Sequence, residues 1–93
     1  MTAIRRRCDL TVRDLGSELI LYDEASETYH VLNDTARRIW DLLDGTRNGA
    51  AIEEAFVSLY PQVEKERLER DLMKALAEFS RMGLLTNPAA AAM

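Results

Sequence analysis

The fold is decided at residues 29–45, which read Tyr29-His30-Val31-Leu32-Asn33-Asp34-Thr35-Ala36-Arg37-Arg38-Ile39-Trp40-Asp41-Leu42-Leu43-Asp44-Gly45. Up to Asn33 the residues favour a strand, and beyond it the apolar positions recur with the period of a helix, about 3.6 residues. The apolar face of this helix consists of Ala36, Ile39, Trp40 and Leu43. Asn33 can cap the helix by accepting from amides of its first turn. A strand therefore passes directly into an amphipathic helix.

Upstream of this switch, three short segments rich in β-branched and aromatic residues predict strands at Leu10–Arg13, Glu18–Asp23 and Glu27–Leu32. Gly16 suits the turn between the first two strands because glycine can adopt a positive φ. Residues 24–26 are expected to form a hairpin loop. The second strand carries apolar residues on both faces, so we expect it to be central or covered on both sides.

Downstream, two further helices are predicted, from about residue 50 to 59 and from about residue 64 to 82. Pro61 stops the first of them, and Gly83 fits the C-terminal cap of the second. Their expected core residues are Ile52, Ala55, Phe56 and Leu59, and then Leu68, Leu72, Ala75 and Phe79. The pattern predicts an α+β domain with a three-stranded antiparallel sheet followed by three helices.

The composition describes one small domain of 93 residues and 10.6 kDa. We expect a flexible basic N-terminus at residues 1–8, a folded domain at residues 9–86 and a flexible tail at residues 87–93. The net charge of −4 argues against nucleic acid as the partner. No stretch is apolar enough to span a membrane, and the single cysteine, Cys8, requires no oxidising compartment. We therefore expect a cytoplasmic protein.

The chain has little material for catalysis. His30 is the only histidine and has no recognisable nucleophile motif beside it. Cys8 lacks a second cysteine to resolve its oxidation, and one Cys and one His are too few for a structural zinc site. The four glycines form no phosphate-binding loop. The sequence predicts a protein that is not an enzyme, with no metal site and no cofactor.

The third predicted strand suggests a different activity. It pairs with the second strand and then enters the first helix, so its outer edge is expected to be open. An extended peptide can add a strand to such an edge and place its side chains in a groove beside a helix. The alternative is that the edge is merely exposed and is protected from pairing by Glu27 and His30.

Residues 32–45 resemble the LNxTAxxIWxLLDG segment of the PqqD-like family, and the resemblance extends to Asp71-Leu72 and to Gly83-Leu84-Leu85. It covers about residues 10–86. The chain departs from the family pattern at residues 48–52, where the second helix begins, and at the polar pair Ser80-Arg81. Neither departure touches the third strand.

The resemblance implies a winged helix-turn-helix-like fold and a function as the recognition element for ribosomally made, post-translationally modified peptides. Such proteins are similar to chaperones. They hold the leader segment of a precursor peptide as a fourth strand beside the third helix, and present the peptide to a modifying enzyme. That enzyme is often a radical SAM protein, and in lasso-peptide systems it is a leader peptidase.

Carried onto this chain, the resemblance implies that the leader pairs antiparallel with the third strand and contacts one flank of the third helix. The favoured flank contains Asp71, which lies in the family motif, and its mixed charge can recognise charged leader residues. The peptide-binding residues are then Glu27, Thr28, Tyr29, His30, Val31, Leu32, Arg67, Asp71, Lys74 and Glu78. The other flank, which stays an alternative, consists of Glu69, Met73, Leu76 and Ser80. Trp40 is expected in the core.

Two other functions stay open. A winged-helix shape with Arg5-Arg6-Arg7 and Arg37-Arg38 could indicate a DNA-binding regulator, although the acidic residues of the third helix oppose binding to phosphates. The domain could also be a structural subunit that docks an enzyme through its helices. An exposed strand edge also invites homodimers by strand exchange.

Overall fold

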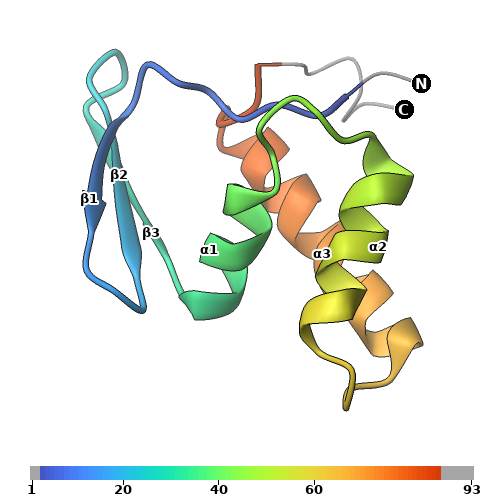
Figure 1. Cartoon of the computed structure of the whole chain (residues 1–93). Coiled ribbons are helices and arrows are strands. Elements are labelled where there is room, and N and C mark those ends of the chain that lie inside the picture. The colour runs from blue at the N-terminus through green and yellow to red at the C-terminus, as the bar shows by residue number, and fades with distance from the viewer. Residues whose placement is uncertain (1–2, 87–93) are drawn as a thin grey trace.

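The structure is a computed structural model that describes residues 3–86. The tail predicted at residues 87–93 and the first two residues of the predicted N-terminal segment lie outside the described residues. The elements are β1 (Thr11–Asp14), β2 (Leu19–Asp23), β3 (Thr28–Leu32), α1 (Asp34–Asp41), α2 (Gly49–Leu59) and α3 (Lys65–Arg81). The predicted α+β order of three strands and then three helices is confirmed. The sheet lies to one side of the three helices (Figure 1).

The sheet is an antiparallel meander with the order β1-β2-β3, so β2 is central as predicted. The register places Leu21 opposite Val12 in β1 and opposite His30 in β3. Leu19, Leu21 and Leu32 are buried, and they mark the face of the sheet that packs toward the helices. The opposite face carries Ile20, Tyr22, Tyr29 and Val31. β1 and β3 form the two edges.

Local hydrogen bonds explain where the elements begin and end. The side chain of Asn33 accepts from the backbone N–H of Ala36 at 2.8 Å, which confirms the predicted cap of α1. Gly83 has a φ of 72° after α3, as its predicted capping position requires. Glu27 has a φ of 52°, which an extended strand cannot contain. β3 therefore begins at Thr28, one residue later than predicted.

The core lies where the three helices meet the inner face of the sheet. Trp40 of α1 packs edge-to-face on Phe79 of α3, with ring centroids 5.5 Å apart, and both residues are buried. Leu59, which was expected in the core, is instead 44% exposed. α2 ends at this residue, and Tyr60 rather than Leu59 packs on Phe56.

Part of the N-terminal segment belongs to the folded unit. Ile4 is buried in the core, and its N–H donates to the carbonyl of Arg47 at 3.0 Å. The N–H of Arg6 donates to the carbonyl of Leu43 at 2.8 Å, and the Arg7 guanidinium pairs with the buried Asp23 at 2.8 Å. The predicted domain start at residue 9 is therefore too late. Ile4 is part of the core, and Arg6 and Arg7 are hydrogen-bonded to the folded domain.

None of the helices within residues 3–86 is long and apolar enough to cross a membrane.

Candidate functional site

The outer edge of β3 carries no strand within the described part of the chain. Its other side pairs with β2 along all five residues, from Thr28 opposite Asp23 to Leu32 opposite Leu19. An edge strand exposes unpaired backbone donors and acceptors at every second residue. The phase of the hydrogen bonds decides which residues these are.

That phase follows from the turn between β1 and β2, where the N–H of Leu15 donates to the carbonyl of Glu18 at 2.9 Å. Hydrogen-bonded pairs recur at every second position of an antiparallel ladder, so the pair of Arg13 and Ile20 is also bonded. The N–H and C=O groups of Ile20 therefore point to β1 and not to β3. The partner of Ile20 in β3 is Val31. The N–H and C=O groups of Val31, and of Tyr29 two residues earlier, therefore point toward the free edge.

The side chains of β3 divide between the two faces of the sheet. Tyr29 and Val31 are 68% and 60% exposed on the outer face, where the Tyr29 ring lies 4.5 Å from that of Tyr22. His30 is half-buried on the inner face and Thr28 is exposed. The side chain of Leu32, which was predicted among the peptide-binding residues, is buried in the core. Its backbone N–H and C=O groups point toward β2 rather than toward the free edge.

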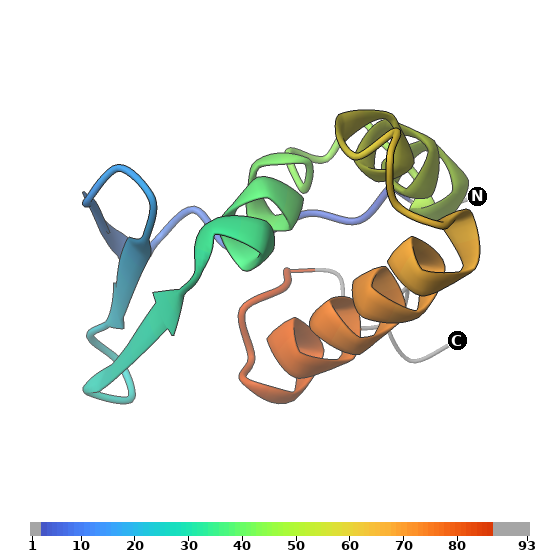
Figure 2. The ribbon, with the colours of Figure 1, turned by 90° about the horizontal axis from the view of Figure 1, so that it is seen from below.

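One flank of α3 faces the start of α1, directly after β3. Figure 2 shows β3 running into α1 with α3 alongside this junction. A hollow of about 180 Å³ lies between the two helices. Its lining consists of Asn33, Thr35, Ala36, Ile39, Asp71, Lys74 and Ala75. Two of the predicted site residues, Asp71 and Lys74, are thus brought close to the end of β3.

A second hollow of about 180 Å³ continues the first toward the turn between α2 and α3. The two hollows share Thr35 and Asp71. The further lining residues of the second are Phe56, Tyr60, Val63, Arg67 and Leu68. Arg67, Asp71 and Lys74 therefore lie along one continuous depression, which we call the α1–α3 groove. Glu78 lies about one helical turn beyond Lys74 and pairs with Arg81.

The charges along the groove are available to a ligand. The Nε atom of Arg67 and the Oδ2 atom of Asp71 are 4.0 Å apart, and both side chains are largely exposed. Such exposed pairs contribute little to stability, so each group can exchange its partner at small cost. The hydroxyl of Tyr60 is buried and has no hydrogen-bond partner within the described residues. A buried hydroxyl without a partner costs about 1–3 kcal/mol of stability.

Sequence reasoning missed three groove residues, Thr35, Tyr60 and Val63. Thr35 is the threonine of the LNxTAxxIWxLLDG match, so the family resemblance could have pointed to it. Tyr60 and Val63 flank the helix-stopping Pro61 and reach the groove only because of how α2 turns into α3. No periodicity marks such positions.

The alternative flank of α3 faces elsewhere. Met73 and Leu76 lie beside Ala50 at the start of α2 and beside Ile4, rather than beside β3. The two flanks proposed from the sequence are therefore separate surfaces of one helix.

Ion pairs attach the sheet to the helices that form the groove. Arg37 of α1 donates to both carboxylate oxygens of Asp14, at 2.5 and 2.6 Å, and to the carbonyl of Gly16 at 2.5 Å. The hydrogen bonds that Asp14 accepts from Arg37 and from the backbone N–H of Gly16 lower its pKa to about 2. Asp23 accepts from Arg7, which lowers the pKa of that carboxyl as well. Within residues 3–86, no group of three or more His, Cys, Asp or Glu side chains could hold a metal ion.

A family model for coenzyme PQQ synthesis protein D (PqqD) matches residues 18–85. The chain belongs to the PqqD family. Among solved structures, this PqqD-family chain is similar to "TbiB1 in Complex with the TbiA(beta) Leader Peptide", with a TM-score of 0.75 and 26% sequence identity. The match covers 88% of this chain and 94% of that chain. A search of curated protein sequences finds no match.

The family match confirms the resemblance on which the sequence prediction relied. The similarity to TbiB1 extends over nearly the whole chain, and so includes β3, α1 and α3. TbiB1 is a protein seen in complex with a leader peptide.

Proposed function

We propose that this PqqD-family chain binds the leader segment of a ribosomally made precursor peptide and presents the peptide to a modifying enzyme, without catalysis of its own. The observation that carries the proposal is the free edge of β3 at Tyr29 and Val31, which lies next to a groove lined by charged residues of α3. The leader peptide in the TbiB1 complex supports it.

In the proposed complex the leader extends the sheet as a fourth strand, antiparallel to β3. Its backbone pairs with the N–H and C=O groups of Tyr29 and Val31, which contributes affinity that is largely independent of leader sequence. Leader side chains opposite His30 point to the inner face of the sheet and toward the α1–α3 groove. The alternate side chains lie on the outer face beside Tyr29 and Val31.

Specificity in this arrangement comes from the groove. Arg67, Asp71 and Lys74 offer both signs of charge along the helix. Binding orders a flexible peptide, which costs about 2–5 kcal/mol of the gross contact energy.

The modifying enzyme is a radical SAM protein or, in a lasso-peptide pathway, a leader peptidase. We infer a cytoplasmic location, where the precursor is synthesised. A second copy of the chain could occupy the same edge by strand exchange, in which case the leader and the second copy compete for β3.

Fluorescence anisotropy with two labelled peptides tests the proposal: the TbiA(beta) leader and the leader of the precursor encoded nearest to the gene for this chain. We expect the Kd of at least one leader to change less than about threefold between about 50 and 200 mM salt, because backbone pairing dominates. A DNA-binding regulator would instead lose orders of magnitude in affinity for a labelled duplex over this range. Binding of duplex DNA without binding of either leader would overturn the proposal.

A further inference from the structure

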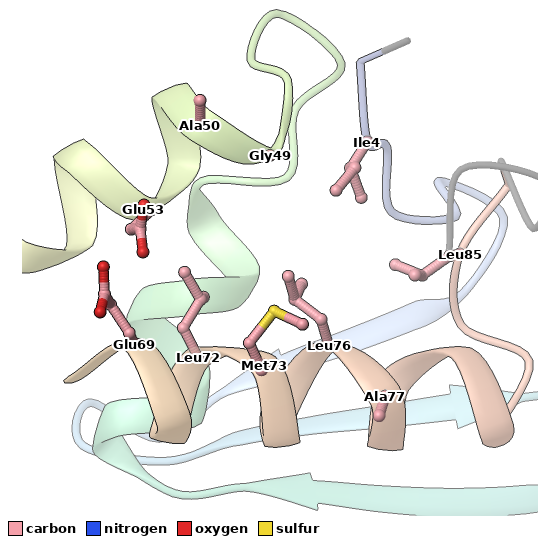
Figure 3. Close-up of a pocket in the computed structure, with 10 residues that line it drawn as sticks. All are labelled: Ile4, Gly49, Ala50, Glu53, Glu69, Leu72, Met73, Leu76, Ala77 and Leu85. Carbon is pink, nitrogen blue, oxygen red and sulfur yellow. The ribbon is translucent and has the colours of Figure 1, made fainter. Parts of the chain in front are cut away.

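A further hollow, separate from the α1–α3 groove, has a mainly apolar lining. It has a volume of about 370 Å³ and lies on the opposite flank of α3, against the start of α2 (Figure 3). Ile4 and Leu85 lie at one end of this hollow, and Glu53 and Glu69 lie at the other. We call it the α2–α3 cleft.

The cleft has an apolar floor and an exposed apolar rim. Leu72 is buried beneath it and Leu76 is half-buried. Met73 projects beside them and is 69% exposed (Figure 3). A flexible, polarizable methionine at the rim of an apolar hollow can adapt its shape to an incoming side chain. The volume corresponds to one or two large side chains rather than to a long peptide.

The acidic end of the cleft holds two like charges close together. The carboxyl groups of Glu53 and Glu69 face each other across the space between α2 and α3 (Figure 3). The neighbouring Glu53 carboxyl, together with partial burial, raises the pKa of Glu69. Within residues 3–86, neither carboxyl forms an ion pair with a lysine or arginine. A cation placed between them would relieve this repulsion.

We propose that the α2–α3 cleft docks the modifying enzyme, by accepting one of its apolar side chains over Leu72 and Leu76 and a neighbouring lysine or arginine between Glu53 and Glu69. This inference rests on the proposed function. It adds a second site, because the cleft and the leader groove occupy opposite flanks of α3. Leader and enzyme can therefore be held at the same time.

Charge argues for this occupant over the tail of the chain itself. Residues 87–93 read Asn-Pro-Ala-Ala-Ala-Ala-Met and contain no lysine or arginine to place between the two carboxylates. The leader is assigned to the other flank by its pairing with β3. An enzyme segment with an apolar residue next to a basic one satisfies both ends of the cleft.

The test measures two affinities for each variant, by biolayer interferometry. One is for the modifying enzyme encoded beside the precursor gene, and the other is for the leader peptide alone. Met73→Glu should weaken enzyme binding at least tenfold and leave the leader Kd within twofold. Lys74→Glu, the matched control on the opposite flank, should change the leader Kd and leave the enzyme Kd within twofold.

A second variant separates docking from a structural role. The double substitution Glu53→Gln and Glu69→Gln removes the repulsion, so we expect the free chain to melt at a higher temperature. The same change should weaken enzyme binding at least threefold, and the remaining affinity should depend less on salt. A merely structural pair would not couple higher stability to weaker docking.

The proposal is wrong if the folded Met73→Glu variant binds the enzyme within twofold of wild type. It is also wrong if the wild-type chain binds the leader but shows no affinity for the enzyme. If Met73→Glu abolishes self-association and spares enzyme binding, the cleft takes a second copy and the proposal is wrong. Failure of the leader to bind, with enzyme binding intact, would overturn the proposed function instead.

Discussion

Replacing Val31 by proline tests strand addition at a single backbone atom. The N–H of Val31 points away from β2, so proline removes a donor from the free edge and no hydrogen bond from the sheet itself. The leader carbonyl opposite Val31 then loses its partner, which costs about 1–3 kcal/mol. At about 1.4 kcal/mol for each factor of ten, the leader Kd should rise between about 5-fold and 150-fold.

The opposite edge of the sheet supplies a matched control. Val12 in β1 is 53% exposed, and the same phase of hydrogen bonds directs its N–H away from β2. Val12→Pro therefore makes an equivalent change at the edge that has no α3 beside it, and leader affinity should stay within twofold. Val31→Ala, which keeps the N–H, separates the backbone effect from loss of the side chain. The assay is fluorescence anisotropy, with thermal unfolding followed by circular dichroism to verify the fold.

The strand-addition account is wrong if folded Val31→Pro binds the leader as tightly as wild type. It is equally wrong if Val12→Pro weakens binding as much as Val31→Pro does.

Three further predictions concern the groove, the core and the attachment of the sheet. Lys74→Glu should change the leader Kd at least about threefold in anisotropy titrations, whereas Arg70→Glu, the same reversal at an exposed position of α3, should leave it within twofold. Phe79→Ala should lower the free energy of unfolding by about 3–5 kcal/mol in urea titrations, because the buried ring packs on Trp40; a loss under 1 kcal/mol would contradict this packing. The pKa of Asp14 is about 2 in the folded chain and near 4 in the unfolded chain, so the pair with Arg37 stabilises the fold fully above about pH 4 and loses this effect as the pH falls toward 2. The melting-temperature difference between wild type and Arg37→Gln should therefore shrink over that interval, and a constant difference would refute the assignment.

The sequence predicted the elements well wherever one local interaction sets a boundary. Asn33 caps α1, and Gly83 follows α3 with positive φ, as expected. The strand boundary at Glu27 was wrong by one residue, since its side-chain pattern continues the strand while its backbone adopts a left-handed turn conformation. Local composition carries no information about that turn.

Other features depend on contacts between segments that are distant in the chain. Ile4 is a core residue because its N–H bonds to Arg47, more than forty residues away, and periodicity in a short basic segment could not indicate this. The direction of the N–H groups in β3 follows from the hydrogen-bond pattern of the preceding hairpin, in which the N–H of Leu15 donates to Glu18. The two hairpins share β2, which carries the pattern from one to the other. Which flank of α3 lies beside the start of α1 likewise depends on how the two helices pack.

The most direct test of the central claim is an isotope-filtered NMR experiment on the ¹³C,¹⁵N-labelled chain with unlabelled leader peptide. In an antiparallel fourth strand, the residues of β3 that bond to β2 direct their Hα atoms toward the leader. We predict a strong nuclear Overhauser effect between the Hα of His30 and an Hα of the leader. Hα contacts from the leader to β1, or contacts to α3 side chains with no Hα contact to β3, would contradict the account.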